Sequence, residues 1–186
     1  MLLLVGLGNP SPENENNRHN IGFKIINAIN KKFALTKQKP KFKGLLTTGR
    51  IGDKKVYAIK PLTFMNNSGI CIRELIEYFK IDSSDVIVFH DDLDIRLGKV
   101  TIKFGGSSAG HNGIESIDKF IGKDYSRVRI GIGRPEKKEM VADHVLDNFL
   151  DDEENSITEL TNNIVEHLPK LIDKKLNLFS SKVNQS

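Results

Sequence analysis

The chain opens with LLLVGLGNP, residues 2–10, and this stretch predicts more of the architecture than any other. Its four leading apolar residues are typical of a short strand that is covered on both faces. The glycines and the proline that follow are turn formers, so Asn9 is expected at the carboxyl end of the strand. Because ligands of open α/β sheets bind outside the carboxyl ends of strands, we expect a polar reaction centre around Asn9.

The next polar segment is expected at the same edge. The tripeptide RHN, residues 18–20, lies just before a stretch in which Ile25, Ile29 and Phe33 recur every four residues. That period predicts an amphipathic helix over residues 22–33. The imidazole of His19 is the kind of group that suits proton transfer near neutral pH, although a lone histidine beside a helix start is more often a packing or capping residue.

Strand-like and helix-like segments alternate along the rest of the chain. Apolar runs predict strands at residues 2–5, 45–51, 56–60, 86–90, 100–104 and 128–132. Helical periodicity predicts helices at residues 22–33, 68–79, 112–121, 138–150 and 153–176. We therefore predict an α/β fold, a single-domain three-layer αβα structure with a twisted, mixed, mostly parallel central sheet, over residues 1–179. The polar segment 180–186 is expected to be a disordered tail.

Local signals add detail to this outline. The dipeptide Gly52-Asp53 predicts a hairpin turn, so part of the sheet should be antiparallel. Ser68 and Asn112 are the expected helix N-caps, and Pro169 is expected to kink or split the last helix. The last helix should pack through one apolar stripe, made of Ile157, Leu160, Ile164, Leu168 and Leu171.

Composition sets mild bounds. The 186 residues are 38% hydrophobic and 28% charged, as in ordinary globular domains, and the net charge of +4 is a modest lean toward an anionic partner such as nucleic acid. Cys71 is the only cysteine, which excludes a disulfide framework, and its apolar neighbours predict a buried thiol. No apolar run approaches the roughly 20 residues that span a bilayer, so no membrane association is expected. The location is predicted to be cytoplasmic, with the matrix of an organelle after processing as the alternative. The six lysines between Lys31 and Lys43 are expected to lie on a solvated loop.

Two loops at strand ends carry further polar groups. In KPLTFMNNS, residues 60–68, Phe64 and Met65 either floor a binding cleft or anchor the loop, and Asn66 is either a ligand-binding amide or a turn residue. In VIVFHDDLD, residues 86–94, an apolar strand ends abruptly in carboxylates. Three interpretations stay open: Asp91 orients His19, the carboxylates bind Mg²⁺, or they form an exposed acidic turn.

A glycine-rich loop, GGSSAGHNG at residues 105–113, leads into a predicted helix. Such a loop lets a ligand approach the backbone, and the free N–H groups of a helix start favour anions. The loop also matches the G-x-S-x-G pattern of serine esterases at Ser108. The turn is too long for the sharp elbow that this nucleophile needs, so a serine esterase is the weaker alternative.

Taken in order, these strings resemble one family, the bacterial-type peptidyl-tRNA hydrolases. The matching strings are VGLGNP (5–10), RHNIG (18–22), KP (60–61), FMN (64–66), SG (68–69), HDDLD (90–94), GG (105–106), GHNG (110–113) and RVRIGIGRP (127–135). The resemblance spans residues 2–149, and so many strings in order and at suitable spacing make it specific.

The resemblance implies an enzyme of translation that hydrolyses the ester between a peptide and the 3′ end of tRNA, which recycles tRNA after ribosome drop-off. It implies that His19 is the base that activates water and that Asp91 orients it. Asn9, Asn66 and Asn112 would hold the substrate around the scissile bond and in part stabilise the oxyanion. Its partners would be the tRNA acceptor stem, the 3′ CCA end and the nascent peptide. It further implies a monomer that needs no metal and no cofactor.

The sequence departs from the family pattern beside Asn9. The family usually has an aromatic residue, commonly tyrosine, where Asn14 stands, and a glycine where Ser11 stands. A contact at the cleft wall, in which Asn14 replaces the aromatic side chain, is therefore in question. A catalytically silent RNA-binding relative is the main rival from another class, and the presence of His19, Asp91 and all three asparagines argues against it.

Two further expectations concern the substrate. Lys103 and Arg129 are the candidates for tRNA phosphate contacts, ahead of Lys99 and Arg127, and ordinary surface charge is the alternative for all four. The segment at residues 140–149 resembles the family's short mobile helix beside the cleft, and we predict that it gates peptide entry.

Overall fold

The opening apolar run forms β1 (Leu2–Gly6), the central strand of a seven-stranded sheet in the computed structural model, which describes residues 1–185. Leu3, Leu4 and Val5 are fully buried. Leu4 packs in the hydrophobic core on one face of the sheet, whereas Leu3 and Val5 pack in the core on the other face. A strand in the middle of three layers must be apolar on both faces, which explains the unbroken hydrophobic run.

The sheet order is β2-β3-β4-β1-β5-β7-β6. The remaining strands are β2 (Lys39–Lys41), β3 (Gly44–Ile51), β4 (Lys54–Pro61), β5 (Val86–Asp92), β6 (Val100–Phe104) and β7 (Ser126–Gly131). The central pairs β4–β1, β1–β5 and β5–β7 are parallel, and the pairs toward both edges are antiparallel. All strands except β3 and β6 therefore run in one direction, which confirms the mixed, mostly parallel sheet.

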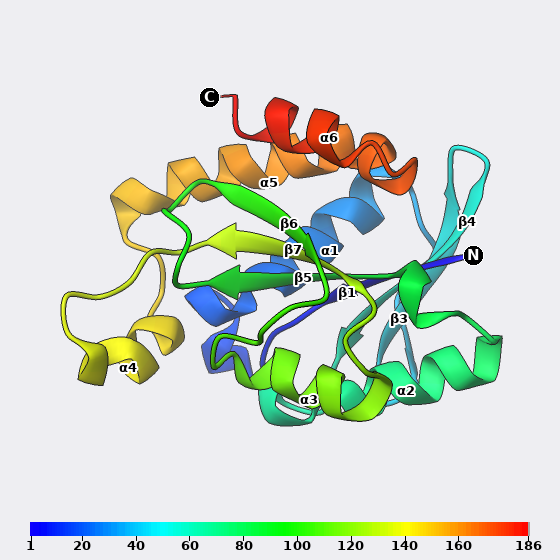
Figure 1. The fold of residues 1–186 in the computed structure, drawn as a ribbon, viewed down its shortest axis with the longest axis horizontal. Helices are drawn as coiled ribbons and strands as arrows, with labels where there is room; N and C mark the ends of the chain where they lie inside the picture. The colour runs from blue at the N-terminus through cyan, green and yellow to red at the C-terminus, as the bar shows by residue number, and fades with distance from the viewer. Residues whose placement is uncertain (186) are drawn as a thin grey trace.

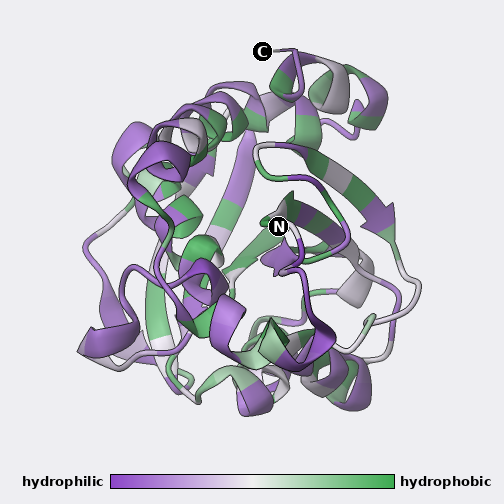
Figure 2. Ribbon diagram, turned by 90° about the vertical axis from the view of Figure 1, so that its left-hand side faces the viewer, coloured by the Kyte–Doolittle hydropathy of each residue, from purple (hydrophilic) through white to green (hydrophobic). Residues whose placement is uncertain are grey.

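Helices cover both faces of the sheet (Figure 1). On one face lie α1 (Ile21–Lys32), α5 (Asp151–Ile172) and α6 (Leu176–Val183), and on the other lie α2 (Ser68–Phe79) and α3 (Asn112–Ile121). A short helix, α4 (Val141–Leu146), lies beside the sheet rather than on it. The covering helices carry both purple and green segments in Figure 2, as amphipathic helices should.

Five 3₁₀ turns complete the elements within residues 1–185: η1 (Pro12–Asn14), η2 (Arg18–Asn20), η3 (Met65–Asn67), η4 (Ser83–Asp85) and η5 (Lys138–Met140). Two of them, η2 and η3, carry predicted site residues directly into the first turn of a helix. Across the part of the chain that the structure describes, no helix has the length and hydropathy needed to cross a membrane.

Two glycines bring α1 against the strand ends. A Cβ on Gly22 would lie 2.4 Å from both Leu7 N and Phe89 O, and a Cβ on Gly6 would lie 2.2 Å from Gly22 O. Any side chain at either position would push the helix away from the sheet. The glycines thus place η2 and the start of α1 directly over the carboxyl ends of β1 and β5.

The helix-cap predictions are wrong in detail. Ser68 and Asn112 are the first residues of α2 and α3, and the N-caps are Asn67 and His111. Only His111 caps through its side chain. The predicted helix at 138–150 is shorter, consisting of η5 and α4.

The C-terminal predictions need a larger correction. Pro169 does not split α5, which continues to Ile172, and a separate helix α6 follows. Residues 180–183 belong to α6, whose Phe179 and Val183 are fully buried, so the prediction of a disordered tail from residue 180 is wrong there. Asn184 pairs its side-chain amide with both backbone groups of Val100, at 2.8 and 2.9 Å. Ser186, the last residue of the predicted tail, lies outside the described residues.

Other packing predictions hold. The stripe of α5 from Ile157 to Leu171 is buried, and Cys71 is fully buried with its pKa raised to about 12 because burial disfavours the thiolate. The lysine-rich segment is exposed as expected. It is not all loop, however, because Lys39–Lys41 pairs with β3 as an edge strand.

Candidate active site

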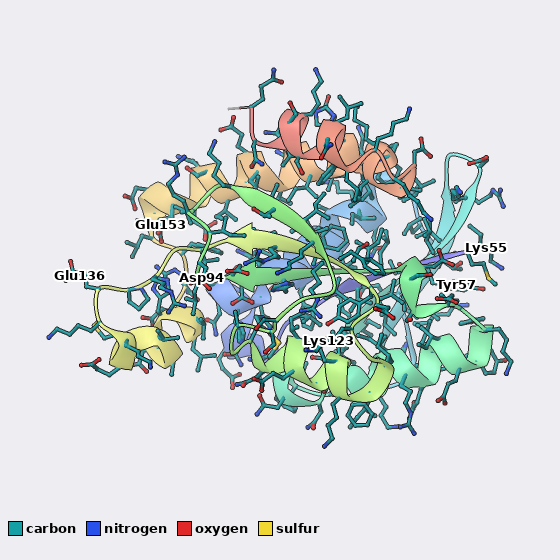
Figure 3. The ribbon with its side chains drawn as sticks, in the orientation of Figure 1. Lys55, Tyr57, Asp94, Lys123, Glu136 and Glu153 are labelled. Carbon is teal, nitrogen blue, oxygen red and sulfur yellow. The ribbon has the colours of Figure 1, made fainter. Side chains whose placement is uncertain are left out.

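The four polar segments meet at the carboxyl ends of β1, β4 and β5. In Figure 3 Asp94 marks this edge, beyond β5, whereas Lys55 and Tyr57 lie near the opposite edge. The tight approach of α1 to β1 and β5 brings His19 to the edge from one side. The loop after β4 and the start of α3 bring the asparagines from the other.

His19 and Asp91 form a buried hydrogen-bonded pair. His19 Nδ1 lies 2.9 Å from Asp91 Oδ1 and 2.8 Å from Asp91 Oδ2. The Asp91 side chain is only 2% exposed. Of the three interpretations of the acidic segment, the geometry fits the one in which Asp91 contacts and orients His19.

His111 is the second partner of Asp91, and sequence reasoning missed it. Its Nδ1 accepts the backbone N–H groups of Gly113 and Ile114 at 3.2 and 3.3 Å, as the N-cap of α3. A nitrogen that accepts carries no proton, so Nε2 carries it and donates to Asp91 Oδ1 at 2.9 Å. The helix cap thereby fixes the tautomer of this histidine.

Charge and burial set the protonation states of the pair. Burial alone would raise the pKa of Asp91, but the neighbouring His19 and His111, with their hydrogen bonds to the carboxylate, outweigh it and hold that pKa far below its usual value. Burial alone would lower the pKa of His19, and the adjacent carboxylate with its hydrogen bond more than compensates, so the net shift is upward. Asp91 is thus an acceptor only, and His19 Nδ1 donates to it, which leaves Nε2 as the basic nitrogen.

His90 lies behind the pair and is fully buried. Its Nδ1 donates to the Asp91 carbonyl oxygen at 2.8 Å, and its Nε2 is a buried atom without a hydrogen-bond partner among the described residues. Burial is the main cause that lowers its pKa to about 3, so the ring is neutral. It supports the backbone at the end of β5.

The donor atoms of His19, Asp91 and His111 lie within 4.8 Å of one another, the donor set of many zinc sites. The hydrogen-bond pattern does not fit a metal, because His111 Nε2 carries a proton and both Asp91 oxygens already accept. The magnesium interpretation fits no better. Asp92 is paired with Arg129 at 2.8 Å, and Asp94 is paired with Arg134 at 2.7 Å.

The predicted asparagines line a cavity of about 430 Å³ beside His19. Its wall is formed by Asn9, Asn14, His19, Phe64, Met65, Asn66, Asn112, Ala142, Val145 and Leu146. No Lys, Arg, Asp or Glu is among them. We call this the amide cavity.

A second cavity of about 530 Å³ adjoins it. Both are lined by His19, Asn112, Ala142 and Val145, so they meet at the base. The second cavity differs in character because charged side chains line it, among them Asp94, Arg134 and Lys138. A substrate with two chemically different halves would fit on either side of His19.

The remaining predicted cleft residues differ in exposure. Phe64 is 54% exposed and has a φ of +63°, whereas Met65 is 3% exposed and so anchors the loop. Asn14 lies at the cavity wall, where its Oδ1 accepts from Asn17 Nδ2 at 2.6 Å. Asn66 and Asn112 are exposed.

The predicted gate contains α4, which contributes to the walls of both cavities. Arg18, next to His19, is 5% exposed and holds this segment. Its Nη1 donates to the His144 carbonyl oxygen at 3.0 Å, its Nη2 pairs with Glu153 at 2.9 Å, and its backbone N–H donates to Asp147 O at 3.0 Å. Movement of α4 stays a prediction.

The four basic candidates are not equivalent. Lys103 is exposed, with its side chain passing beside Gly106. Arg129 is engaged with Asp92. Arg127 is 2% exposed and bonds Asp118 and the Ser107 carbonyl oxygen, so it supports the glycine-rich loop from within. Lys99 bonds the Asn184 carbonyl oxygen at 3.2 Å.

Ser108 has no histidine partner within residues 1–185. Its Oγ lies 3.4 Å from Glu115 Oε1, and no histidine of the described chain hydrogen-bonds it. Both nitrogens of His111 are committed elsewhere. The geometry therefore lacks the serine–histidine contact of an esterase.

Comparison with known proteins gives one consistent result. A family model described as peptidyl-tRNA hydrolase matches residues 3–186. Among curated proteins, a peptidyl-tRNA hydrolase of Pelagibacter ubique is 76% identical over 184 residues, covering 99% of each chain, and one of Bartonella henselae is 44% identical over 186 residues, covering 100% of this chain and 96% of its own. The crystal structure of the Acinetobacter baumannii peptidyl-tRNA hydrolase has a TM-score of 0.93 at 33% identity, covering 99% of this chain and 94% of its own.

Proposed function

The chain belongs to the peptidyl-tRNA hydrolase family, and on that premise we propose that it hydrolyses the ester between peptide and tRNA with a water activated by His19. The observation that carries the mechanism is the His19–Asp91 pair beside the amide cavity. An ester with a ribose leaving group needs a positioned water, one base and a few hydrogen-bond donors.

His19 acts as base through Nε2. His19 Nδ1 keeps its proton and donates it in a hydrogen bond to Asp91, so the free lone pair of the ring is on Nε2. That nitrogen takes a proton from water as the water oxygen attacks the ester carbonyl carbon. The resulting imidazolium is stabilised by the Asp91 carboxylate and returns the proton to the ribose 3′ oxygen as the ester bond breaks.

The asparagines supply the neutral donors of the reaction. Met65 N–H donates to Asn9 Oδ1 at 2.9 Å, so the Asn9 side chain presents its Nδ2 as a donor. Asn66 and Asn112 lie on the same cavity wall. Amides bind the backbone of a peptide and the oxyanion of a tetrahedral intermediate without competing for the proton that His19 moves.

Lys103 is the better candidate for a tRNA phosphate contact, because Arg129 would first have to leave Asp92. The monomeric state and the contacts to the acceptor stem and CCA end remain predictions from the resemblance, and the cytoplasmic location remains a prediction from the hydropathy of the chain.

The test is release of the blocked amino acid from N-acetyl-aminoacyl-tRNA by wild type and by His19→Ala. His167→Ala, which removes a histidine from the surface of α5, is the matched control and should keep full activity. Loss of the base should lower the rate on the order of 10²-fold or more. A wild-type chain that binds tRNA without cleaving it would instead be an RNA-binding relative, and loss of activity in Ser108→Ala would point to the serine esterase.

A further inference from the structure

Asn20 is buried in the middle of the site, and the reaction described above gives it no role. Its side chain lies in η2, directly after His19, and the residue is 1% exposed. Both polar atoms of its amide bond one residue. Asn9 N–H donates to Asn20 Oδ1 at 2.8 Å, and Asn20 Nδ2 donates to the Asn9 carbonyl oxygen at 2.8 Å.

These contacts also fix the orientation of the Asn20 amide. A backbone N–H can only donate and a backbone carbonyl can only accept, so the amide oxygen must face Asn9 N and the amide nitrogen must face Asn9 O. The side chain therefore forms a two-point clamp on the backbone of Asn9, much as a neighbouring strand would. Asn9 lies beyond the end of β1, where the sheet no longer holds it.

A third contact fixes the Asn9 side chain. Met65 N–H donates to Asn9 Oδ1, and no residue between 1 and 185 accepts a hydrogen bond from Asn9 Nδ2. The backbone of Asn9 is clamped and its side-chain oxygen is occupied, so the direction of its Nδ2 donor is fixed. Asn9 lines the amide cavity, where this donor is available to a substrate. A donor that stabilises an oxyanion is effective because it is held in place before the reaction begins.

We propose that Asn20 is a positioning residue that fixes the Asn9 Nδ2 donor relative to the His19 base. The Asn9 donor and the His19 base lie ten residues apart in the sequence. The clamp joins them because Asn20, which bonds the Asn9 backbone, directly follows His19. The inference rests on the proposed function, since it assigns a role within that reaction. A misplacement of about 1 Å can cost on the order of 10²-fold in rate, so loss of the clamp should be visible in kcat.

The decisive variant is Asn20→Asp, which keeps an acceptor for Asn9 N–H and removes the donor to Asn9 O. We expect kcat on N-acetyl-aminoacyl-tRNA to fall by about 10- to 100-fold, with KM changed by less than about threefold. The new carboxylate adds a negative charge beside His19, so kcat is compared on the alkaline plateau of each pH profile, where the carboxylate is ionised and His19 is neutral. Asn30→Asp is the matched control, since Asn30 is a partly buried asparagine of α1 that bonds Thr47 away from both cavities, and its kcat should equal that of wild type.

A double-mutant cycle separates positioning from general support. Asn9→Ala removes the donor itself, so adding Asn20→Asp in that background should lower kcat by less than about twofold. Effects that multiply, or a wild-type kcat in Asn20→Asp, would overturn the clamp. If Asn20→Asp does not fold, Asn20→Ser, which also cannot hold both Asn9 groups, is judged by the same two criteria. If wild type and Asn20→Asp are equally active, the role of Asn20 is refuted and the proposed function stands. If wild type does not cleave the substrate, the proposed function is refuted as well.

Discussion

Asp91 Oδ1 accepts a hydrogen bond from His111 Nε2 at 2.9 Å, so the carboxylate that contacts His19 is held by a second imidazole. The same His111 caps α3 through Nδ1. One side chain thus ties the helix start to the Asp91 carboxylate. The arrangement makes the orientation of the candidate base depend on the position of α3.

This dependence predicts the behaviour of His111→Asn. Asparagine is a good N-cap, so α3 should keep its stability to within about 1 kcal/mol, but the shorter side chain cannot reach Asp91. We expect kcat to fall by about tenfold, the effect of losing roughly one hydrogen bond to a charged group. Urea unfolding and kcat measured on the same preparation check both halves, and an unchanged kcat would show that Asp91 needs no second partner.

Asp91→Asn should shift the pH dependence of activity as well as lower it. The carboxylate is what keeps the pKa of His19 above its usual value against the opposing effect of burial. Without it, burial should pull that pKa down, and the acid limb of the kcat/KM profile should move to lower pH. The rate should also fall, by on the order of 10³-fold, because an amide does not hold the correct tautomer. Asp124→Asn, at an exposed position, is the control and should leave the profile unchanged.

Stability should fall in acid because of His90. Its folded-state pKa of about 3 lies below the unfolded value of 6.5, so the unfolded chain binds more protons between these limits. The free energy of unfolding should therefore decrease as the pH drops through this window, with a slope of up to about 1.4 kcal/mol per pH unit from this group. Urea titrations at pH 7.5, 6 and 5 measure the slope. His90→Phe, which fills the same space without titrating, should have the smaller slope, and equal slopes would contradict the assignment.

The order of the elements could be predicted because each signal is local. Residues 68–79 and 112–121 form helices with the predicted bounds, since their apolar stripes have a period that only a helix matches. The tail prediction failed for a tertiary reason. Polar residues dominate 180–186, but Phe179 and Val183 lie four apart and bury in the core with Val100, which no local signal reports.

The candidate site also has a part that the sequence predicts and a part that depends on tertiary packing. The positions of His19, Asp91 and the asparagines follow from strand ends, because topology brings the carboxyl ends of parallel strands to one edge. The role of His111 depends on how α3 approaches β5, because His111 and its partner Asp91 are twenty residues apart in the sequence. Likewise, the sequence shows Arg129 as a charge but not that Asp92 neutralises it.

Arg18→Lys should loosen α4. Lysine cannot bond the His144 carbonyl oxygen and Glu153 together with the planar geometry of a guanidinium. We expect faster hydrogen exchange across α4 and a KM that rises about three- to tenfold, as expected if about 1 kcal/mol of preorganisation is lost. Arg73→Lys, at an exposed arginine paired with Glu77, is the control. Unchanged exchange in α4 would show that Arg18 does not hold the gate.

Lys103→Ala should weaken tRNA binding uniformly, whereas Arg129→Ala should have the smaller effect. Lys103 is exposed, while Arg129 would have to give up Asp92 before it could meet a phosphate. Each phosphate contact that is lost should reduce the slope of log Kd against log salt by about one unit. The measurement is binding of deacylated tRNA at several salt concentrations, with Lys123→Ala, another exposed lysine, as the control. A larger slope change in Arg129→Ala than in Lys103→Ala would mean that RNA displaces Asp92, because only then does the arginine charge become available to the phosphate.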